Sequence, residues 1–175
     1  MDPLPIPAID PAAPLVQRLS GIPGAPTELV HWHPGLRRLL GYWQGLCAGR
    51  PLPRRADLDP AAIGPDILPN LMMLGREAGS GRFVYRLVGT GIVRAREGLR
   101  PHDPTGRYVD ETPHRMSHDW ILAGPSRAAA EKRPIYDSGQ YELAADRGGR
   151  YERLSLPLSA DGETVDRLLV GFFVG

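Results

Sequence analysis

Proline limits the length of every regular element that this chain can form. The sequence has 19 prolines and 21 glycines among 175 residues, and each proline fixes φ and removes a backbone N–H donor. Seven of these prolines fall within residues 1–28, where no hydrogen-bonded ladder can persist. We therefore expect residues 1–32 to form a flexible, proline-rich arm and residues 33–175 to form one domain built from short elements.

The first element after this arm is predicted to be an amphipathic helix. Pro34 suits the first position of a helix, because its missing N–H would have no partner there. Apolar residues then recur at a spacing of three or four as far as Gly49, namely Leu36, Leu39, Leu40, Trp43, Leu46 and Cys47. This stripe could cover a sheet or pair with the same stripe of a second copy, and the second possibility predicts a homodimer.

A hairpin and a broken helical region follow. Asp59 and Pro60 predict the start of a short helix that ends near Ile67, with Pro69 as its stop. Two runs with the composition of strands, 71–74 and 83–88, flank a glycine-rich turn and predict a β-hairpin. Helical periodicity then predicts helices over 91–97, 114–123 and 127–132, the last two separated because Gly124-Pro125 removes a helical hydrogen bond.

The C-terminal third is predicted to form three strands over 135–143, 150–158 and 165–174, joined by two tight turns. The last strand is apolar on both faces, which indicates the centre of the sheet. In the middle strand Leu154 and Arg153 point to opposite faces, and only the leucine face is apolar, as in a sheet covered on one side. The chain is therefore predicted to be an α+β domain with a five-stranded antiparallel sheet, helices on one side and an N-terminal amphipathic helix.

Charge and cysteine content exclude several classes of protein. The 21 Lys+Arg and 20 Asp+Glu residues leave a formal net charge of +1, which argues against a nucleic-acid-binding protein. Apolar runs are too short for a membrane-spanning helix, and no secretory signal is visible. Cys47 is the single cysteine and is expected to be a buried structural thiol. We expect a cytoplasmic protein that binds neither nucleic acid nor membrane.

Several phrases of the sequence resemble a bacterial PAS-domain family of often stand-alone proteins. They lie within about residues 33–173 and read RPLPRRADLDP at 50–60, ILP at 67–69, YRLVGT at 85–90, TGRY at 105–108 and YERLSLPL at 151–158. The resemblance implies a five-stranded antiparallel sheet flanked by short helices, with a pocket between sheet and helices for a ligand or cofactor. It also implies a role in sensing or in protein–protein signalling, but it identifies no particular ligand or cofactor.

Strand alternation and the position of the helical insert suggest which side chains reach such a pocket. We expect ligand contacts from Tyr85, Leu87, Trp120, Tyr141, Arg153 and Leu154. Arg153 also needs a partner if it is buried, either a ligand or an acidic side chain such as Asp110 or Glu111.

A metal site is not predicted. His114 and His118 are four residues apart on a predicted helix, which is a metal-ligand spacing, but the glutamate of the metalloprotease motif and a third ligand are missing. Exposed or capping histidines explain this pair more simply. A flavin-adduct photosensor would need a cysteine in the helical insert, and Cys47 precedes the first strand.

The sequence therefore predicts a sensory module without catalytic activity, which binds a small ligand, an unidentified signalling protein, or both. We expect this module to have no output domain of its own, and therefore to pass its signal to a partner or through a change of oligomeric state. One alternative is an interaction scaffold without a ligand, in which the proline-rich arm is a docking peptide. Another is a small enzyme that uses Asp110, Glu111 and His114.

Overall fold

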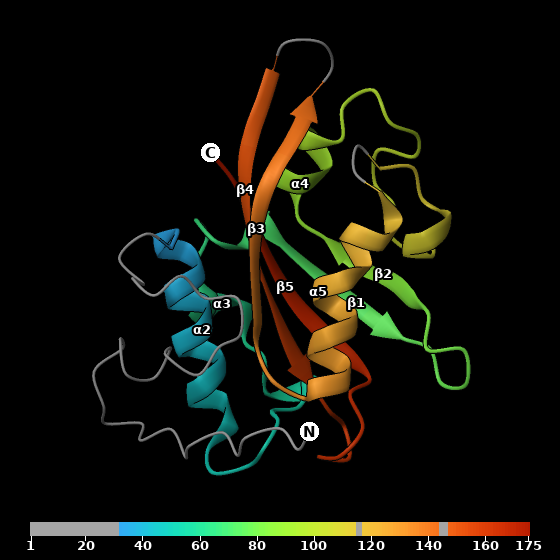
Figure 1. Ribbon diagram of the computed structural model, residues 1–175. Coiled ribbons are helices and arrows are strands. Elements are labelled where there is room, and N and C mark those ends of the chain that lie inside the picture. The colour runs from blue at the N-terminus through green and yellow to red at the C-terminus, as the bar shows by residue number, and fades with distance from the viewer. Residues whose placement is uncertain (1–31, 115–116, 144–146) are drawn as a thin grey trace, which may run out of the picture.

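The fold is known from a computed structural model that describes residues 32–114, 117–143 and 147–175, with the backbone alone for 141–143 and 147–148. The arm predicted for residues 1–32 therefore lies, apart from Trp32, outside the described residues. The strands are β1 (Leu71–Arg76), β2 (Phe83–Val88), β3 (Ile135–Leu143), β4 (Arg147–Leu158) and β5 (Arg167–Val174). They form one antiparallel sheet in the order β2-β1-β5-β4-β3 (Figure 1). This confirms the predicted α+β fold with its five-stranded sheet and the central position of the last strand.

The described helices cover both faces of the sheet. The α-helices are α2 (Pro34–Cys47), α3 (Pro60–Ile63), α4 (Thr90–Ala95) and α5 (His118–Glu131), and the 3-10 helices are η2 (Arg55–Asp57), η3 (Leu68–Asn70) and η4 (Val109–Glu111). In Figure 1, α2 and α3 lie on one side of the sheet and α4 and α5 on the other. The insert between β2 and β3 therefore occupies a face of its own.

The apolar stripe of α2 packs on the sheet. Leu36 and Leu39 are fully buried, and their Cδ2 atoms lie 2.7 and 2.8 Å from the point where a Cβ of Gly171 in β5 would stand. The indole Nε1 of Trp43 donates to the carbonyl of Pro157 in β4 at 2.9 Å. Of the two uses predicted for this stripe, the structure shows the intramolecular one. A homodimer remains a prediction and would need another surface.

The structure differs from two of the helix predictions. The helix predicted over 60–67 stops at Ile63, because Gly64 turns the chain with φ +100°, and Pro69 lies inside η3 instead of ending a helix. The helices predicted over 114–123 and 127–132 are one continuous helix, α5, with Pro125 inside it. It begins after Ser117, whose side chain accepts a hydrogen bond from the amide of Trp120.

A β-bulge changes the alternation of β2. Met73 of β1 pairs with Leu87, but the next residue, Leu74, pairs with Tyr85, so Arg86 is an extra residue without a partner in β1. An extra residue in one strand shifts the following side chains to the opposite face. Tyr85 and Val88 therefore reach the same cavity although their spacing in sequence is odd.

The strand β4 is covered on both faces, and the expectation of cover on one face was wrong. Leu154 and Leu156 are fully buried on the α2 side, while Arg153 and Ser155 on the α5 side are 4% and 0% exposed. A polar residue at such a position needs an internal partner.

Candidate functional site

A cavity of about 410 Å³ lies between the sheet and the helical insert. Most of its wall is apolar and comes from β1, β2, α4, α5 and β5, including Met72, Val88, Ile92, Leu99, Ile121 and Phe172. Its polar wall consists of Tyr85, Arg94, Arg96, Glu97, His114 and Arg153. Pockets for small organic ligands typically have volumes of about 300–1,000 Å³ and are apolar with a few placed polar groups. The cavity has the size and the lining of such a pocket.

Tyr85 is a buried residue of β2 that lines the cavity wall. Its side chain is 4% exposed, and no described residue forms a hydrogen bond with its hydroxyl. Burial raises the pKa of Tyr85 to about 12, although the cations Arg96 and Arg153 oppose this effect. The phenol is therefore neutral at physiological pH and can donate a hydrogen bond to a ligand.

Arg96 joins the loop after α4 to the segment that precedes α5. Its guanidinium donates to the carbonyls of Pro101, His102 and Pro113 at 3.3, 3.1 and 3.1 Å. The residue is 7% exposed, and no carboxylate among the described residues forms an ion pair with it. Burial lowers the pKa of Arg96, because a low-dielectric environment disfavours its charge. The cavity wall thus contains a buried cation whose hydrogen-bond partners among the described residues are neutral, while the carboxylate that acts on it from a distance, Asp103, is exposed.

His114 lies beside Arg96 and is neutral. Its Nε2 is 3.0 Å from the carbonyl of Val109, which can only accept, so Nε2 carries the proton and Nδ1 faces Arg96 Nη1 at 3.4 Å. Burial, together with the positive charge of Arg96, lowers the pKa of His114 to about 4, although its hydrogen bond with Val109 opposes this shift. The prediction that His114 lies on a helix was wrong, since His114 precedes α5. The rings of His114 and His118 nevertheless pack edge-on, with their centroids 5.3 Å apart. Among the described residues, His, Cys, Asp and Glu form no group of three that could hold a metal ion.

The low pKa of His114 predicts that the fold loses stability as the pH falls below neutrality. The unfolded chain takes up a proton near the ordinary pKa of 6.5, whereas folded His114 stays neutral down to about 4. Its contribution to the free energy of unfolding is therefore complete above pH 6.5 and is lost between pH 6.5 and 4, by about 2 kcal/mol at pH 5. Urea unfolding at pH 7 and pH 5 should show this loss, and His114→Asn should reduce it. An equal loss in both proteins would contradict the prediction.

Arg153 joins β4, β3 and α5. Its Nε lies 3.0 Å from each carboxylate oxygen of Asp137, the residue paired with it in β3. Its Nη1 and Nη2 donate to the α5 carbonyls of Ile121 and Trp120 at 2.6 and 3.1 Å. The expectation that Asp110 or Glu111 would be its partner was wrong.

The Gly124-Pro125 pair explains why Arg153 can bond helix carbonyls. Pro125 has no N–H, so the carbonyl of Ile121, four residues earlier, has no helical donor and accepts from Arg153. A Cβ on Gly124 would lie 2.3 Å from Asp137 Oδ2 and 3.0 Å from Arg153 Nη2. Glycine and proline together let α5 approach the ion pair closely, while the carbonyls of Trp120 and Ile121 both accept from Arg153.

Only some of the residues predicted to contact a ligand line the cavity. Tyr85 and Arg153 line the cavity. Leu87 is 53% exposed and lies outside the cavity lining, because the bulge at Arg86 reverses the alternation on which its placement was based. Leu154 is fully buried on the opposite face, as its pairing with Gly171 under α2 requires.

The remaining predicted positions are Trp120 and Tyr141. Trp120 is 39% exposed and packs edge-on against Tyr151 with ring centroids 4.8 Å apart, above Gly139 of β3, and it is not part of the cavity lining. Tyr141 belongs to β3, but its side chain lies outside the described residues.

Sequence reasoning missed Arg96 and His114 as cavity residues. The signal for Arg96 was the charged stretch around 94–103, which is longer and more polar than a simple connection needs. His114 was considered only as a metal ligand or catalytic group. Neither local pattern indicated that both side chains turn inward and meet.

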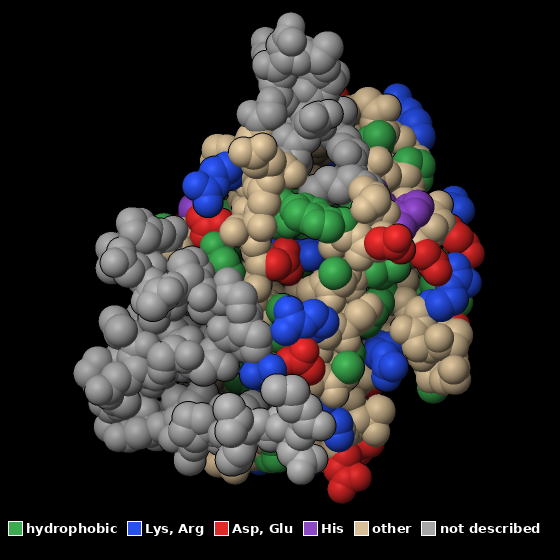
Figure 2. Space-filling model, viewed as in Figure 1, with side chains coloured by type: hydrophobic (Ala, Val, Ile, Leu, Met, Phe, Trp, Pro, Cys, Tyr) green, Lys and Arg blue, Asp and Glu red, His purple; other side chains and the backbone are tan. Residues whose placement is uncertain are grey.

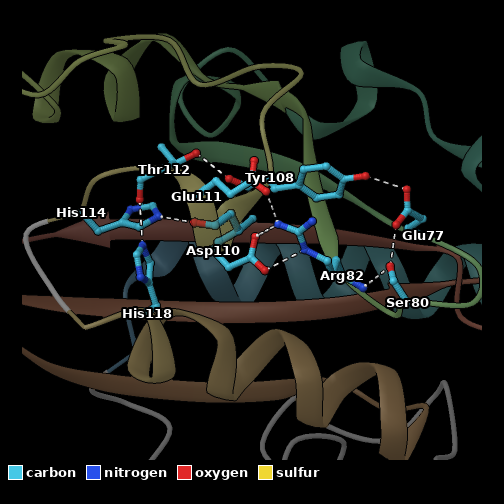
Figure 3. A network of polar contacts seen from close by, with 10 residues as sticks. Glu77, Ser80, Arg82, Tyr108, Asp110, Glu111, Thr112, His114 and His118 are labelled. Atoms are coloured by element: carbon cyan, nitrogen blue, oxygen red, sulfur yellow. Dashed lines mark hydrogen bonds and ion pairs between the residues drawn. The ribbon is translucent and has the colours of Figure 1, made fainter.

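A polar network joins the hairpin turn after β1 to the start of α5 (Figure 3). Arg82 bonds both oxygens of Asp110 at 2.8 and 2.7 Å, bonds Glu111 at 2.5 Å, and lies 3.8 Å above the ring of Tyr108. Glu77 accepts from the hydroxyl of Tyr108 at 2.6 Å. Asp110 and Glu111 therefore form ion pairs with Arg82, whereas His114 forms a hydrogen bond with the carbonyl of Val109. The three residues of the enzyme hypothesis do not form one catalytic group.

The face shown in Figure 2 has basic and acidic side chains interspersed, without a large patch of one sign. Elsewhere among the described residues, charges of opposite sign form exposed ion pairs such as Arg127–Glu131, at 3.1 Å. Among the described helices, none combines the length and the apolar character that crossing a membrane would require.

The sheet order β2-β1-β5-β4-β3, with a helical insert between β2 and β3, is that of a PAS-like α+β domain. A protein-family model described as PAS domain matches residues 31–103. This match confirms the resemblance for the phrases within residues 31–103, whereas those at 105–108 and 151–158 lie beyond it. No curated protein matches the chain.

Solved structures similar to this chain share little sequence with it. The PAS domain from Bordetella pertussis BvgS is 18% identical, with a TM-score of 0.37 over 60% of this chain and 74% of that one. The ligand-binding domain of the Pseudomonas aeruginosa PAO1 amino acid chemoreceptor PctC in complex with GABA is 20% identical, with a TM-score of 0.40 over 80% and 53%. An RNA-binding light-oxygen-voltage receptor is 16% identical, with a TM-score of 0.34 over 60% of this chain and 29% of the receptor.

Proposed function

We propose that this chain is a cytosolic sensory module that binds a small organic molecule in the cavity between the sheet and the α4–α5 insert, without catalysing a reaction. The observation that supports the proposal best is the cavity of about 410 Å³, whose apolar wall carries the buried polar groups of Tyr85, Arg96 and Arg153. A core that only stabilises the fold would fill this volume with side chains, because protein interiors are close-packed.

Two arginines of the cavity wall also form hydrogen bonds with α5 and with the loop after α4, the parts of the chain that would respond to a bound ligand. Arg153 lines the cavity and at the same time holds the carbonyls of Trp120 and Ile121 in α5. Arg96 lines it and holds the loop that leads to His114. A ligand that bonds either guanidinium competes with or reinforces these contacts, and so changes how firmly α5 and the loop are held. The signal then passes to a partner protein or to a second copy of the chain.

Filling the cavity tests the proposal. Val88 lines the cavity, whereas its neighbour Leu87 is exposed outside it, so Val88→Trp and Leu87→Trp form a matched pair. A fragment library would be screened by saturation-transfer NMR with the wild-type protein and both variants, after circular dichroism has shown that they fold. We expect fragments whose affinity falls about tenfold or more with Val88→Trp and stays unchanged with Leu87→Trp.

Two results would contradict the proposal. Fragments that bind both variants equally would bind outside the cavity. A complete absence of binders, together with native mass spectra of empty protein, would favour the interaction scaffold without a ligand.

A further inference from the structure

The charges around the cavity are not balanced. Among the described residues, the charged side chains of its wall are Arg94, Arg96, Glu97 and Arg153. Asp137 neutralises Arg153, and Arg94 and Glu97 are exposed to water, which screens their charges. Among the described residues, the buried Arg96 bonds only carbonyls and an imidazole, and the carboxylate that acts on it, Asp103, is exposed to water. A buried cation is costly unless an anion accompanies it.

The hydrogen-bonding groups at this point are mainly donors. Nη1 of Arg96 carries a pair of N–H groups, and its one acceptor among the described residues is Nδ1 of His114 at 3.4 Å. The ring of Tyr85 is 6.3 Å from that of His114, and no described residue accepts from its hydroxyl. His114 Nδ1 is an acceptor already directed at Arg96. A ligand group that satisfies this corner must therefore accept hydrogen bonds.

From these observations we infer that the ligand is an organic acid whose carboxylate bonds Arg96 and Tyr85 and whose apolar body fills the rest of the cavity. The inference rests on the proposed function, because it names the chemical class of the molecule that the cavity binds. A carboxylate supplies acceptors for the guanidinium fork and the phenol, and its single charge balances Arg96, the buried cation of the cavity wall that bonds no carboxylate among the described residues. A phosphate monoester would bring a larger charge than Arg96 can balance. The apolar wall, with Met72, Val88 and Phe172, suits an alkyl or aryl body.

Pairs of probes that have the same shape but differ in charge show how much the negative charge contributes to binding. Octanoate, phenylacetate and benzoate would each be compared with the corresponding neutral amide by isothermal titration calorimetry. At least one carboxylate should bind the wild-type protein about tenfold more tightly than its amide. In Arg96→Gln this preference should fall to about threefold or less. Because the preference is a ratio within one protein, any loosening of the loop that Arg96 holds affects both probes and cancels.

A second variant tests the same inference without changing the contacts of Arg96 to the loop after α4. Tyr85→Phe removes a hydroxyl that bonds no described residue, and it should weaken the carboxylate more than the amide. The inference is overturned if no carboxylate of the panel binds more tightly than its amide, or if the preference survives Arg96→Gln unchanged.

The same measurements separate this inference from the proposed function. If amides and carboxylates bind equally, and Val88→Trp abolishes both while Leu87→Trp affects neither, the cavity is a ligand site for neutral molecules and only the inference fails. If Val88→Trp changes the binding of no probe and no library fragment, both fail.

Discussion

Replacing Arg153 by methionine is expected to lower the free energy of unfolding by about 3 kcal/mol. Methionine replaces the aliphatic part of the arginine side chain but removes every donor. The carboxylate of Asp137 loses its ion pair, and the carbonyls of Trp120 and Ile121 lose hydrogen bonds of 3.1 and 2.6 Å. The carbonyl of Ile121 cannot find another donor in the helix, because Pro125 occupies the position that would supply it. Urea unfolding followed by tryptophan fluorescence measures the change.

The control for this prediction is an exposed ion pair of the same helix. Arg127 bonds Glu131 at 3.1 Å, with 49% of the arginine side chain exposed, and Arg127→Met should cost less than about 1 kcal/mol. Adding Asp137→Asn to Arg153→Met should recover part of the loss, since it removes the uncompensated charge. Equal losses for Arg153→Met and Arg127→Met would show that the pair with Asp137 does not hold α5 on the sheet.

The architecture could be predicted because its signals are local. Proline positions, the glycine-rich turn after β1 and the alternation of apolar residues each act over a few neighbouring residues, and together they predicted five strands around a helical insert. The central position of β5 followed from the apolar character of both its faces. These local preferences agree with the final fold, so the packing of the sheet and helices does not override them.

The partner of Arg153 could not be predicted, because it depends on strand register. β4 begins at Arg147, earlier than the predicted start at Arg150, and this register places Asp137 directly opposite Arg153. A shift of one residue would have turned Asp137 to the other face of the sheet. Leu87 was misplaced for a related reason, since the bulge at Arg86 cannot be seen in an alternation pattern.

The continuous helix α5 shows tertiary contacts overriding a local rule. Gly124 and Pro125 each disfavour the interior of a helix, and together they predicted a break. The helix continues because Arg153 satisfies the carbonyl that Pro125 leaves free, and because the missing Cβ of Gly124 makes room for Asp137. The same two residues that argue against a helix are thus the ones that fit it to this part of the sheet.

Gly89→Ala is the other substitution from which we expect a large effect, a loss of about 3 kcal/mol. Gly89 caps α4 and donates its N–H to the carbonyl of Leu71 at 2.7 Å. A Cβ there would lie 2.3 Å from the carbonyl oxygen of Pro69 and 2.7 Å from that of Leu68. These are backbone atoms of η3, which cannot rotate away, so α4 would have to shift. Because α4 supplies Ile92 and leads directly into Arg96, ligand affinity should fall together with stability.

A glycine in open surroundings provides the matched control. Gly41 lies inside α2 and has no neighbouring atom within 4 Å of the position of a Cβ. Gly41→Ala should therefore raise the free energy of unfolding by about 0.5–1 kcal/mol, because alanine favours the helix and restricts the unfolded chain. Opposite signs for the two substitutions, measured by urea unfolding, would show that close approach of α4 to η3 is what requires glycine at position 89. A gain of stability with Gly89→Ala would mean that α4 can move away from η3 freely, and the cavity wall would then be less firmly held than the structure indicates.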